Sequence, residues 1–315
     1  MIVSILFILC AMVLYCFGTY LLVKGSSAIA LQAGISPIVA GLTIVAFGTC
    51  SPGLVVSILA NIAGKGNIVI GSVIGSNFFN IGIILGIAAL VSPLKIKMQL
   101  LKRNILILIL ATFGFILLFN DRHISRGEGL MLLSGILIYT ILTIYFARKE
   151  KSREVQDEFL ASANKIKTKW QWSTAMILAG IGILVAGSES LLKGAVDLSR
   201  MLGAGNTIIG FTVIAAVSGM PALIFSVVAT KRKQYDIALG NIIGAGVFNI
   251  LGTTGISAII GPLSAIAVSN IDLYVMIGVV LLLLQFFRAN QTLKREDGYF
   301  MAGIYFMYIY YLWPK

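Results

Sequence analysis

Hydroxyl and thiol side chains gather inside an apolar segment of the chain, in the run AFGTCSPGLVVS that begins at residue 46. Thr49, Cys50 and Ser51 stand directly before Pro52 and Gly53. A proline has no backbone N–H and frees an upstream carbonyl oxygen in a helix. Rings of such neutral oxygens suit weakly hydrated monovalent ions or a neutral polar solute. The run therefore predicts a broken helix that lines an uncharged binding site.

The chain repeats itself at an offset of 169 residues. GLTIVA at 41–46 matches GFTVIA at 210–215, and NIVIGSVIGSNFFN at 67–80 matches DIALGNIIGAGVFN at 236–249. A duplicated five-helix unit crosses a membrane an odd number of times, so its second copy must insert upside down. Inverted repeats of this kind build secondary transporters, with sites near the midplane on interrupted helices. We expect the helix breakers to be Pro52, Pro221, Gly75 and Gly244; alternatively, they are ordinary kinks and small residues for close helix packing.

The composition indicates a membrane protein. Hydrophobic residues make up 58% of the chain and charged residues 11%, with a mean hydropathy of +0.98. A membrane-spanning helix needs about 20 apolar residues. We therefore predict an all-α integral membrane protein of ten transmembrane helices in two inverted five-helix repeats, with spans at roughly 1–21, 36–61, 66–91, 100–120, 126–147, 173–193, 206–231, 236–261, 268–288 and 298–314. The first run has no basic segment before Lys24, and we interpret it as a retained helix.

The basic residues indicate a topology rather than a nucleic-acid interface. The formal net charge is +12, and most of the 24 Lys and Arg residues fall on one side when the predicted loops are assigned alternately. By the positive-inside rule, both termini then lie outside. The longest polar connection, 148–172, becomes a cytoplasmic linker between a first repeat at 1–147 and a second at 173–315. We expect a multi-pass protein of a prokaryotic plasma (inner) membrane, with the lipid bilayer and a small cation or solute as partners, and the oligomeric state stays open.

Two motifs of the repeats carry a family resemblance. GLTIVAFGTCSP at 41–52 and GSVIGSNFFNIGIILG at 71–86 resemble the α-repeat of the cation/calcium antiporter superfamily, which includes the sodium/calcium exchangers. FTVIAAVSGMPA at 211–222 and GNIIGAGVFNILG at 240–252 resemble it more loosely. The likeness extends over essentially the whole chain. It implies ten helices, with an ion site formed by the two proline-bearing helices and the glycine-rich helices that follow them.

The resemblance also implies which positions form the site. In the family, the residue after each motif proline is a glutamate that coordinates calcium, and here those positions are Gly53 and Ala222. Calcium takes about 6–8 oxygen ligands, and its affinity depends on how many are charged. We therefore expect a monovalent cation or small solute rather than calcium. The implied ion or solute site consists of Thr49, Cys50, Ser51, Gly53, Ser76, Asn80, Ser218, Ala222 and Asn249.

Few other residues are candidates for chemistry. Glu189 is the one acidic residue that lies clearly inside a predicted span, and an ionisable group within the membrane is a functional candidate by default. Lys193 follows it at the favourable i,i+4 spacing, so we interpret the two as a structural pair or vestibule charges. Cys50 could bind a thiophilic metal, but with no second Cys or His beside it we interpret it as a small buried thiol. We expect no enzyme activity, no catalytic residue, no cofactor and no nucleic-acid partner.

Two functions remain open from the sequence. The first is a secondary transporter of the sodium/calcium exchanger type that works by alternating access and moves a monovalent cation or small solute. The second is a transport-inactive homologue that acts as a membrane scaffold or regulatory subunit. An abandoned site should drift towards apolar filling, so the retained polar residues favour transport; they are Thr49, Ser76, Asn80, Ser218 and Asn249.

Overall fold

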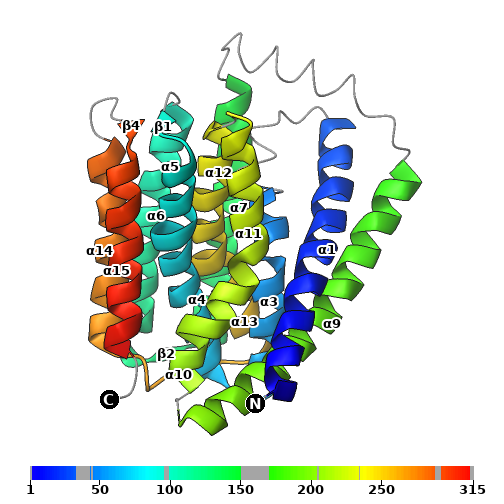
Figure 1. Cartoon of the computed structure of the whole chain (residues 1–315), viewed down its shortest axis with the longest axis vertical. Helices are drawn as coiled ribbons and strands as arrows, with labels where there is room; N and C mark the ends of the chain where they lie inside the picture. The colour runs from blue at the N-terminus through cyan, green and yellow to red at the C-terminus, as the bar shows by residue number, and fades with distance from the viewer. Residues whose placement is uncertain are drawn as a thin grey trace.

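The apolar runs of the sequence fold into long helices that lie side by side (Figure 1). A computed structural model describes residues 2–32, 43, 45–95, 99–149, 170–203, 206–233, 235–287 and 292–312. The predicted start of the second span at 36 and nearly all of the linker at 148–172 lie outside the described residues. Among the described residues, seven helices are long and apolar enough to cross a membrane: Ile2–Leu22, Gly66–Val91, Lys102–Asp121, Arg126–Phe146, Trp170–Leu198, Thr207–Lys231 and Ile237–Ile260. Ala46–Ile62 and Asn270–Leu284 are shorter apolar helices. The protein is thus a multi-pass helical membrane protein.

The elements follow one another in nearly the same order in the two halves. The first half contains α1 (Ile2–Gln32), α3 (Ala46–Ile62), α4 (Gly66–Phe78), the π-helix η2 (Phe79–Leu85), α5 (Gly86–Val91), β1 (Leu94–Lys95), α6 (Gln99–Leu118), the 3-10 helix η3 (Phe119–Asp121), β2 (His123–Ile124) and α7 (Arg126–Lys149). The second half contains α9 (Trp170–Leu202), α10 (Asn206–Ile209), the π-helix η4 (Gly210–Ile214), α11 (Ala215–Lys231), α12 (Tyr235–Val247), the π-helix η5 (Phe248–Thr253), α13 (Thr254–Ile260), β3 (Leu263–Ser264), α14 (Asn270–Phe287), β4 (Thr292–Leu293) and α15 (Arg295–Leu312).

The offset of 169 residues reappears in the backbone. It carries both ends of α3 onto the ends of α11 and both ends of α4 onto those of α12. The turn between these helices repeats as well, because Gly64 has a φ of 70° and its equivalent Lys233 a φ of 62°. A left-handed φ is unfavourable for a lysine, so the second half keeps this turn without the glycine that suits it.

Two short β-ribbons cross between the halves. In one, β1 pairs with β4 and Leu94 lies opposite Leu293. In the other, β2 pairs with β3 and Ile124 lies opposite Leu263. The offset carries Leu94 onto Leu263 and Ile124 onto Leu293, so each ribbon is the copy of the other. The ribbons lie at opposite ends of the helices (Figure 1). Exchanging the two halves therefore also exchanges the two ends of the molecule.

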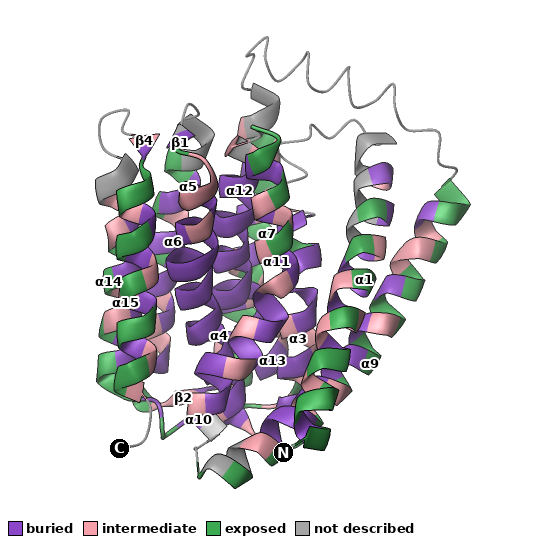
Figure 2. Cartoon of the chain, viewed as in Figure 1, coloured by how far each residue is buried: buried purple, intermediate pink, exposed green. Residues whose placement is uncertain are grey.

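The core of the bundle is formed by the glycine-rich helices. The spans Gly66–Val91 and Ile237–Ile260 are almost entirely buried, whereas Ile2–Leu22 and Trp170–Leu198 are largely exposed (Figure 2). A helix that is apolar all round and buried on every side belongs to the interior of a bundle. Both interior spans contain a π-helix, η2 in the first and η5 in the second. The polar residues of the two repeats are thereby carried to the centre of the protein.

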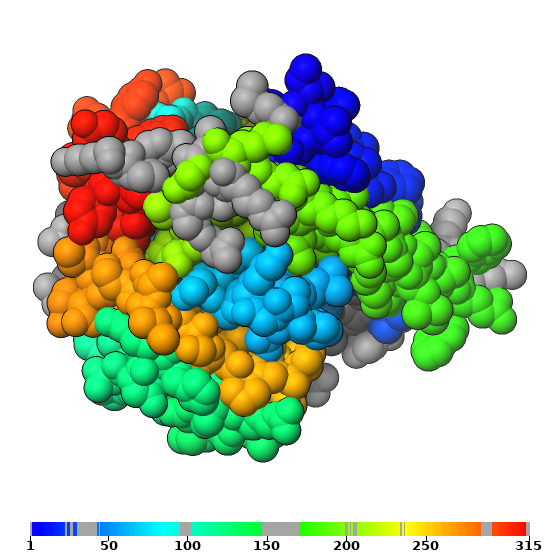
Figure 3. All heavy atoms as spheres, turned by 90° about the horizontal axis from the view of Figure 1, so that it is seen from below, coloured from blue at the N-terminus to red at the C-terminus, as the bar shows by residue number. Residues whose placement is uncertain are grey.

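The helices α1 and α9 pack against each other at one side of the bundle (Figures 1 and 3). Small residues bring them close: a Cβ added at Gly25 would lie 2.5 Å from the carbonyl oxygen of Ser173, and one at Gly194 would lie 2.7 Å from that of Ser4. These two contacts are equivalent under the offset. Close approach through glycine is a common way for helices to associate in membranes.

The predicted helix breakers do not interrupt their helices, and this prediction is wrong. Pro52 lies inside the continuous helix α3 and Pro221 inside α11. Gly75 and Gly244 lie within α4 and α12. The irregular hydrogen bonding occurs instead in the π-helices η2, η4 and η5, a feature that is frequent at functional sites. Gly75 serves close packing, since a Cβ there would lie 2.5 Å from the carbonyl oxygen of Phe211.

Candidate functional site

A small cavity lies where α3 and α11 meet the ends of the two buried helices. Its volume is ≈ 10 Å³, about the least room that holds one water-sized particle. Described residues that line it come from both halves: Thr49, Cys50, Gly53, Ser76, Asn80, Ser218, Gly219, Ala222 and Asn249. All but one of the residues predicted for the ion or solute site therefore surround a single space. The exception is Ser51, which is buried but donates its hydroxyl to the carbonyl oxygen of Phe47 at 2.8 Å.

Gly219 also lines the cavity, although it is not among the residues predicted for the ion or solute site. The offset relates it to Cys50, so the internal repeat could have identified it. The same offset relates Thr49 to Ser218, Gly53 to Ala222 and Asn80 to Asn249. The cavity thus lies between equivalent residues of the two halves.

Two hydroxyl groups of the cavity, those of Thr49 and Ser218, direct their hydrogens into the protein. Ser218 donates to the carbonyl oxygen of Ile214 at 2.6 Å. Thr49 has the carbonyl oxygen of Ala46 at 3.2 Å and the side-chain oxygen of Asn241 at 2.9 Å as acceptors. A hydroxyl has one hydrogen and two acceptor lone pairs. Because the hydrogens of these two hydroxyls are used within the protein, their lone pairs remain available to a cation or another donor in the cavity.

The amide of Asn80, in the cavity lining, carries a buried nitrogen without a hydrogen-bond partner in the described structure. Its side chain is 4% exposed, and its Nδ2 has no hydrogen-bond partner. Leaving a buried donor unpaired costs about 1–3 kcal/mol. A bound water or a solute oxygen would satisfy the donor. A rotated amide would instead present its oxygen to a cation, since both ends of the group occupy nearly the same space.

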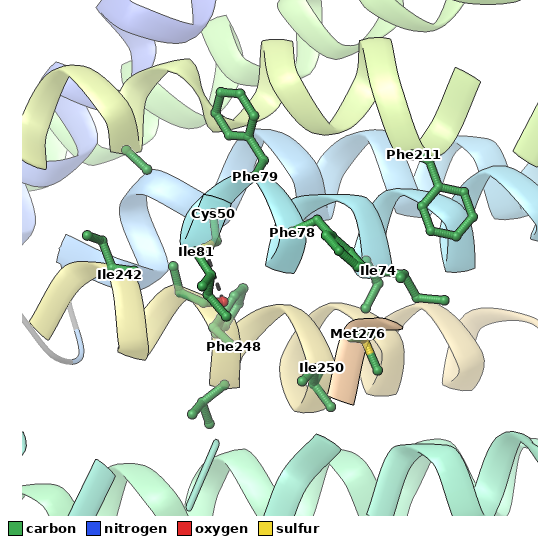
Figure 4. Close-up of a cluster of buried hydrophobic side chains, with 14 of the residues drawn as sticks. Cys50, Ile74, Phe78, Phe79, Ile81, Phe211, Ile242, Phe248, Ile250 and Met276 are labelled. Carbon is green, nitrogen blue, oxygen red and sulfur yellow. Dashed lines mark hydrogen bonds between the residues drawn. The ribbon is translucent and has the colours of Figure 1, made fainter. Parts of the chain in front are cut away.

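Charge is absent from the described lining of the cavity. Neither an acidic nor a basic side chain is among these residues, and no group of three or more His, Cys, Asp or Glu residues that could hold a metal occurs in the described part of the chain. Cys50 is buried, and its sulfur lies 3.7 Å from the carbonyl oxygen of Ala245. It belongs to a cluster of buried apolar side chains (Figure 4). What the cavity offers to a ligand is therefore a small set of neutral dipoles.

A second, larger pocket lies between α1 and α11 and shares one lining residue, Thr49, with the cavity. Its volume is ≈ 360 Å³. Thr49 lines both spaces, so its side chain stands between the cavity and a pocket that also includes Lys24 and Arg232. The described residues that line it are Cys16, Thr19, Tyr20, Lys24, Thr49, Pro221, Ile224, Phe225, Val228 and Arg232.

The equivalent region between α9 and α3 is packed differently. There the hydroxyl of Ser188, the counterpart of Thr19, can donate to the carbonyl oxygen of Leu184 at 2.7 Å or to that of Pro52 at 3.5 Å. It also accepts a hydrogen bond from the Tyr15 hydroxyl at 3.0 Å. The Thr19 hydroxyl, by contrast, is buried without a partner in the described structure. The two ends of the molecule thus differ, with a pocket beside α11 and a direct contact beside α3.

The chain matches the family model described as "Sodium/calcium exchanger protein" over residues 3–145 and 172–313. It belongs to the sodium/calcium exchanger family. The putative antiporter CaxA of Alkalimonas amylolytica is 33% identical over 320 residues, covering 100% of both chains. The sodium/calcium exchanger MaX1 of Methanosarcina acetivorans is 29% identical and covers 98% of this chain and 97% of its own. A solved structure of the sodium-calcium exchanger NCX_Mj superposes with a TM-score of 0.71, 28% identity and 98% coverage of each chain.

The family membership confirms the resemblance on which the site was predicted. The chain is a relative of cation antiporters, and its fold is that of a solved sodium-calcium exchanger. Two predicted residues lie away from the cavity. Glu189 and Lys193 are exposed residues of α9, and the described structure contains no ion pair between them, although their spacing predicted one.

Proposed function

We propose that the protein is a secondary transporter of the exchanger type that moves a monovalent cation or small solute, rather than calcium, through an uncharged central site. The observation that carries this proposal is the cavity itself. Its described lining comes from both halves and holds Thr49, Ser218, Asn80 and Asn249, with no carboxylate. In this proposal Gly53 and Ala222 occupy the positions of the family's calcium-binding glutamates.

Calcium is disfavoured by the energetics of such a lining. A divalent ion loses its hydration when it enters a buried site, and neutral amides and hydroxyls return too little of that energy. A monovalent ion loses much less, and neutral oxygen dipoles bind it in channels. The volume of ≈ 10 Å³ also restricts the occupant to one small particle. A neutral lining of this size is suited to a single dehydrated monovalent ion or a solute of similar size.

The proposed architecture has ten transmembrane helices in two inverted repeats, at 1–147 and 173–315, joined by the linker at 148–172. The exchanged β-ribbons at opposite ends support the inversion, and the family model matches the chain in two stretches. The first helix begins and α15 ends at the same end of the bundle (Figure 1), as an even number of crossings requires. The basic residues favour an outside position for both termini, in a prokaryotic inner membrane.

Alternating access is supported by the difference between the two ends. The pocket beside α11 reaches Thr49, while Ser188 contacts Pro52 at the equivalent position beside α3. In this proposal the second state opens between α9 and α3 and closes between α1 and α11. Glu189 and Lys193 are the equivalents of Tyr20 and Lys24, which line the open pocket. They therefore become charges of the opposite vestibule.

Flux into proteoliposomes tests the proposal. Sodium, potassium, calcium and proton gradients are imposed one at a time, and uptake and counterflow are measured with and without the protein. We expect counterflow of a monovalent ion and no sodium-driven calcium uptake. Calcium uptake driven by sodium in the unmodified protein would overturn the substrate assignment. Absence of flux with every ion would favour the transport-inactive scaffold or regulatory subunit instead.

A further inference from the structure

The pocket between α1 and α11 combines apolar walls with two cationic residues. Its volume of ≈ 360 Å³ lies in the range of about 300–1,000 Å³ that is typical of ligand sites. Lys24 and Arg232 are the charged residues among the described residues that line it. We propose that this pocket binds an anionic phospholipid, with the phosphate held by Lys24 and Arg232 and one acyl chain lying along α11.

The wall formed by α11 has the length of one lipid leaflet. Pro221, Ile224, Phe225, Val228 and Arg232 recur every three or four residues, which places them on one face of the helix. From Pro221 to Arg232 the helix rises about 16 Å at ~1.5 Å per residue. This is about half of the ~30 Å hydrocarbon core of a bilayer. A single acyl chain can therefore extend from the cations to the bottom of the pocket.

The pocket is open to the side as well as lined by apolar residues. Ile224 is 46% exposed and Val228 is 43% exposed, although both line the pocket. On α1, Tyr20 is 55% exposed. Exposed apolar side chains of a membrane protein face lipid chains, so a chain can enter between α1 and α11 from the bilayer.

Thr19 supplies a polar group at the depth where a phospholipid has its ester carbonyls. Its side chain is 4% exposed, and its hydroxyl has no partner in the described structure. It precedes Lys24 by five residues, about 7.5 Å deeper along α1 at ~1.5 Å per residue. Its counterpart Ser188 has partners within the protein. The missing partner is thus a feature of this pocket, and an acceptor oxygen of a lipid would supply it.

The pair of cations occurs at one end of the molecule. The offset relates Lys24 to Lys193 but Arg232 to Ala63, and it relates Tyr20 to Glu189. The equivalent region beside α3 therefore has one cation and an acid that repels phosphate. Basic pockets between transmembrane helices recognise anionic head groups. Charge complementarity consequently favours an anionic lipid in the pocket beside α11.

A bound chain would reach Thr49, which also lines the central cavity. The lipid would then close this route to the cavity. That consequence rests on the proposed transport function, whereas lipid binding itself does not.

Native mass spectrometry of the delipidated full-length protein tests the site. Phosphatidylglycerol and phosphatidylcholine are titrated separately, and the affinity of the first bound lipid is measured. We expect phosphatidylglycerol to bind more tightly. The double variant Lys24→Gln/Arg232→Gln should weaken its binding by roughly 10- to 30-fold, since each basic residue near anionic lipid contributes a few-fold to tenfold. The matched control Lys193→Gln/Lys231→Gln removes two exposed cations that do not line the pocket and should retain the binding.

Filling the pocket provides an independent test with both cations in place. Val228→Trp and Ile224→Trp should each lower phosphatidylglycerol binding, provided that the thermal melting of at least one variant matches the unmodified protein. The proposal would be overturned if phosphatidylcholine bound as tightly as phosphatidylglycerol, or if the control variant lost as much binding as Lys24→Gln/Arg232→Gln. It would also be overturned if a folded tryptophan variant bound phosphatidylglycerol as the unmodified protein does. Complete displacement by glycerol phosphate alone would show that only the head group is recognised, which would also overturn it.

Discussion

Thr49 of α3 donates a hydrogen bond of 2.9 Å to the side-chain oxygen of Asn241 in α12. This bond joins the two halves of the chain beside the cavity. Asn241 is completely buried, and its Nδ2 donates to Ser226 at 3.1 Å. Its equivalent in the first half is Ser72, which lies 3.3 Å from Ser57. A serine is shorter than an asparagine, so the two halves hold their cavity hydroxyls differently.

Replacing Asn241 by the serine of the other half tests this network. The Asn241→Ser variant removes the acceptor of Thr49 and the donor to Ser226, although Thr49 keeps the carbonyl oxygen of Ala46. We expect a loss of about 1–2 kcal/mol in stability, because two buried hydrogen bonds are lost while Thr49 keeps a second acceptor. Thermal melting in detergent measures it. The control Ser134→Ala removes an exposed hydroxyl that bonds only within its own helix, and an equal effect there would contradict the prediction.

A methyl group at Gly75 is predicted to disturb the core. The added Cβ would lie 2.5 Å from the carbonyl oxygen of Phe211 and 2.6 Å from its Cα. Backbone atoms cannot yield as the end of a flexible side chain can. We expect Gly75→Ala to lower stability by about 1–3 kcal/mol. Gly114→Ala is the matched control, since nothing lies within 4 Å of its added Cβ, and it should be neutral or stabilising as a helical Gly→Ala change. Equal melting temperatures would count against the close α4–η4 contact.

Much of the site could be predicted because the two halves repeat in sequence. The offset of 169 residues paired Thr49 with Ser218 and Asn80 with Asn249, and each pair lines the cavity. Hydrophobicity likewise indicated where the long helices lie. Ser51 was predicted as part of the polar cluster before Pro52, yet its hydroxyl donates to the carbonyl oxygen of Phe47. A side chain's direction on a helix depends on its rotation about the axis, which proximity in sequence does not give.

The π-helices could not be predicted from the same pattern. Proline and glycine suggested breaks, but α3 continues through Pro52 and α4 through Gly75. The extra residue of a π-turn is accommodated by packing: at η2, the ring of Phe79 lies where a side chain at Gly219 would stand, 2.6 Å from its added Cβ. Such a contact joins residues far apart in the chain. Hydrophobic periodicity indicates which face of a helix is buried. It does not indicate which carbonyl oxygen each backbone N–H binds, and that choice distinguishes a π-helix from an α-helix.

Restoring the two acids should create calcium binding. In the Gly53→Glu/Ala222→Glu variant, carboxylates from both halves would face the cavity, and calcium affinity rises with the number of charged ligands. We expect calcium affinity to increase by roughly tenfold or more, measured by titration calorimetry. A Cβ at Gly53 has room, since its nearest neighbour is the Ser218 hydroxyl at 3.6 Å. The Gly53→Gln/Ala222→Gln variant has the same size without charge. Equal calcium binding by both variants would contradict the assignment of these positions.

The two equivalent hydroxyls of the cavity should contribute similarly to transport. Thr49→Val and Ser218→Ala each remove one neutral oxygen from the lining. Losing one such ligand costs about 1 kcal/mol, which corresponds to roughly a fivefold weaker apparent affinity. We expect each variant to raise the KM of monovalent flux in proteoliposomes by about this factor, and the double variant to raise it further.

Ser51→Ala is the control for this pair. It removes a buried hydroxyl from the same turn of α3, but that hydroxyl bonds to Phe47 and does not line the cavity. Its flux should therefore match that of the unmodified protein. If Ser51→Ala impaired flux as much as Thr49→Val did, the effect would come from the stability of α3 and not from the cavity. If neither cavity hydroxyl affected the KM, the solute would have to take a path that avoids the space between the two halves.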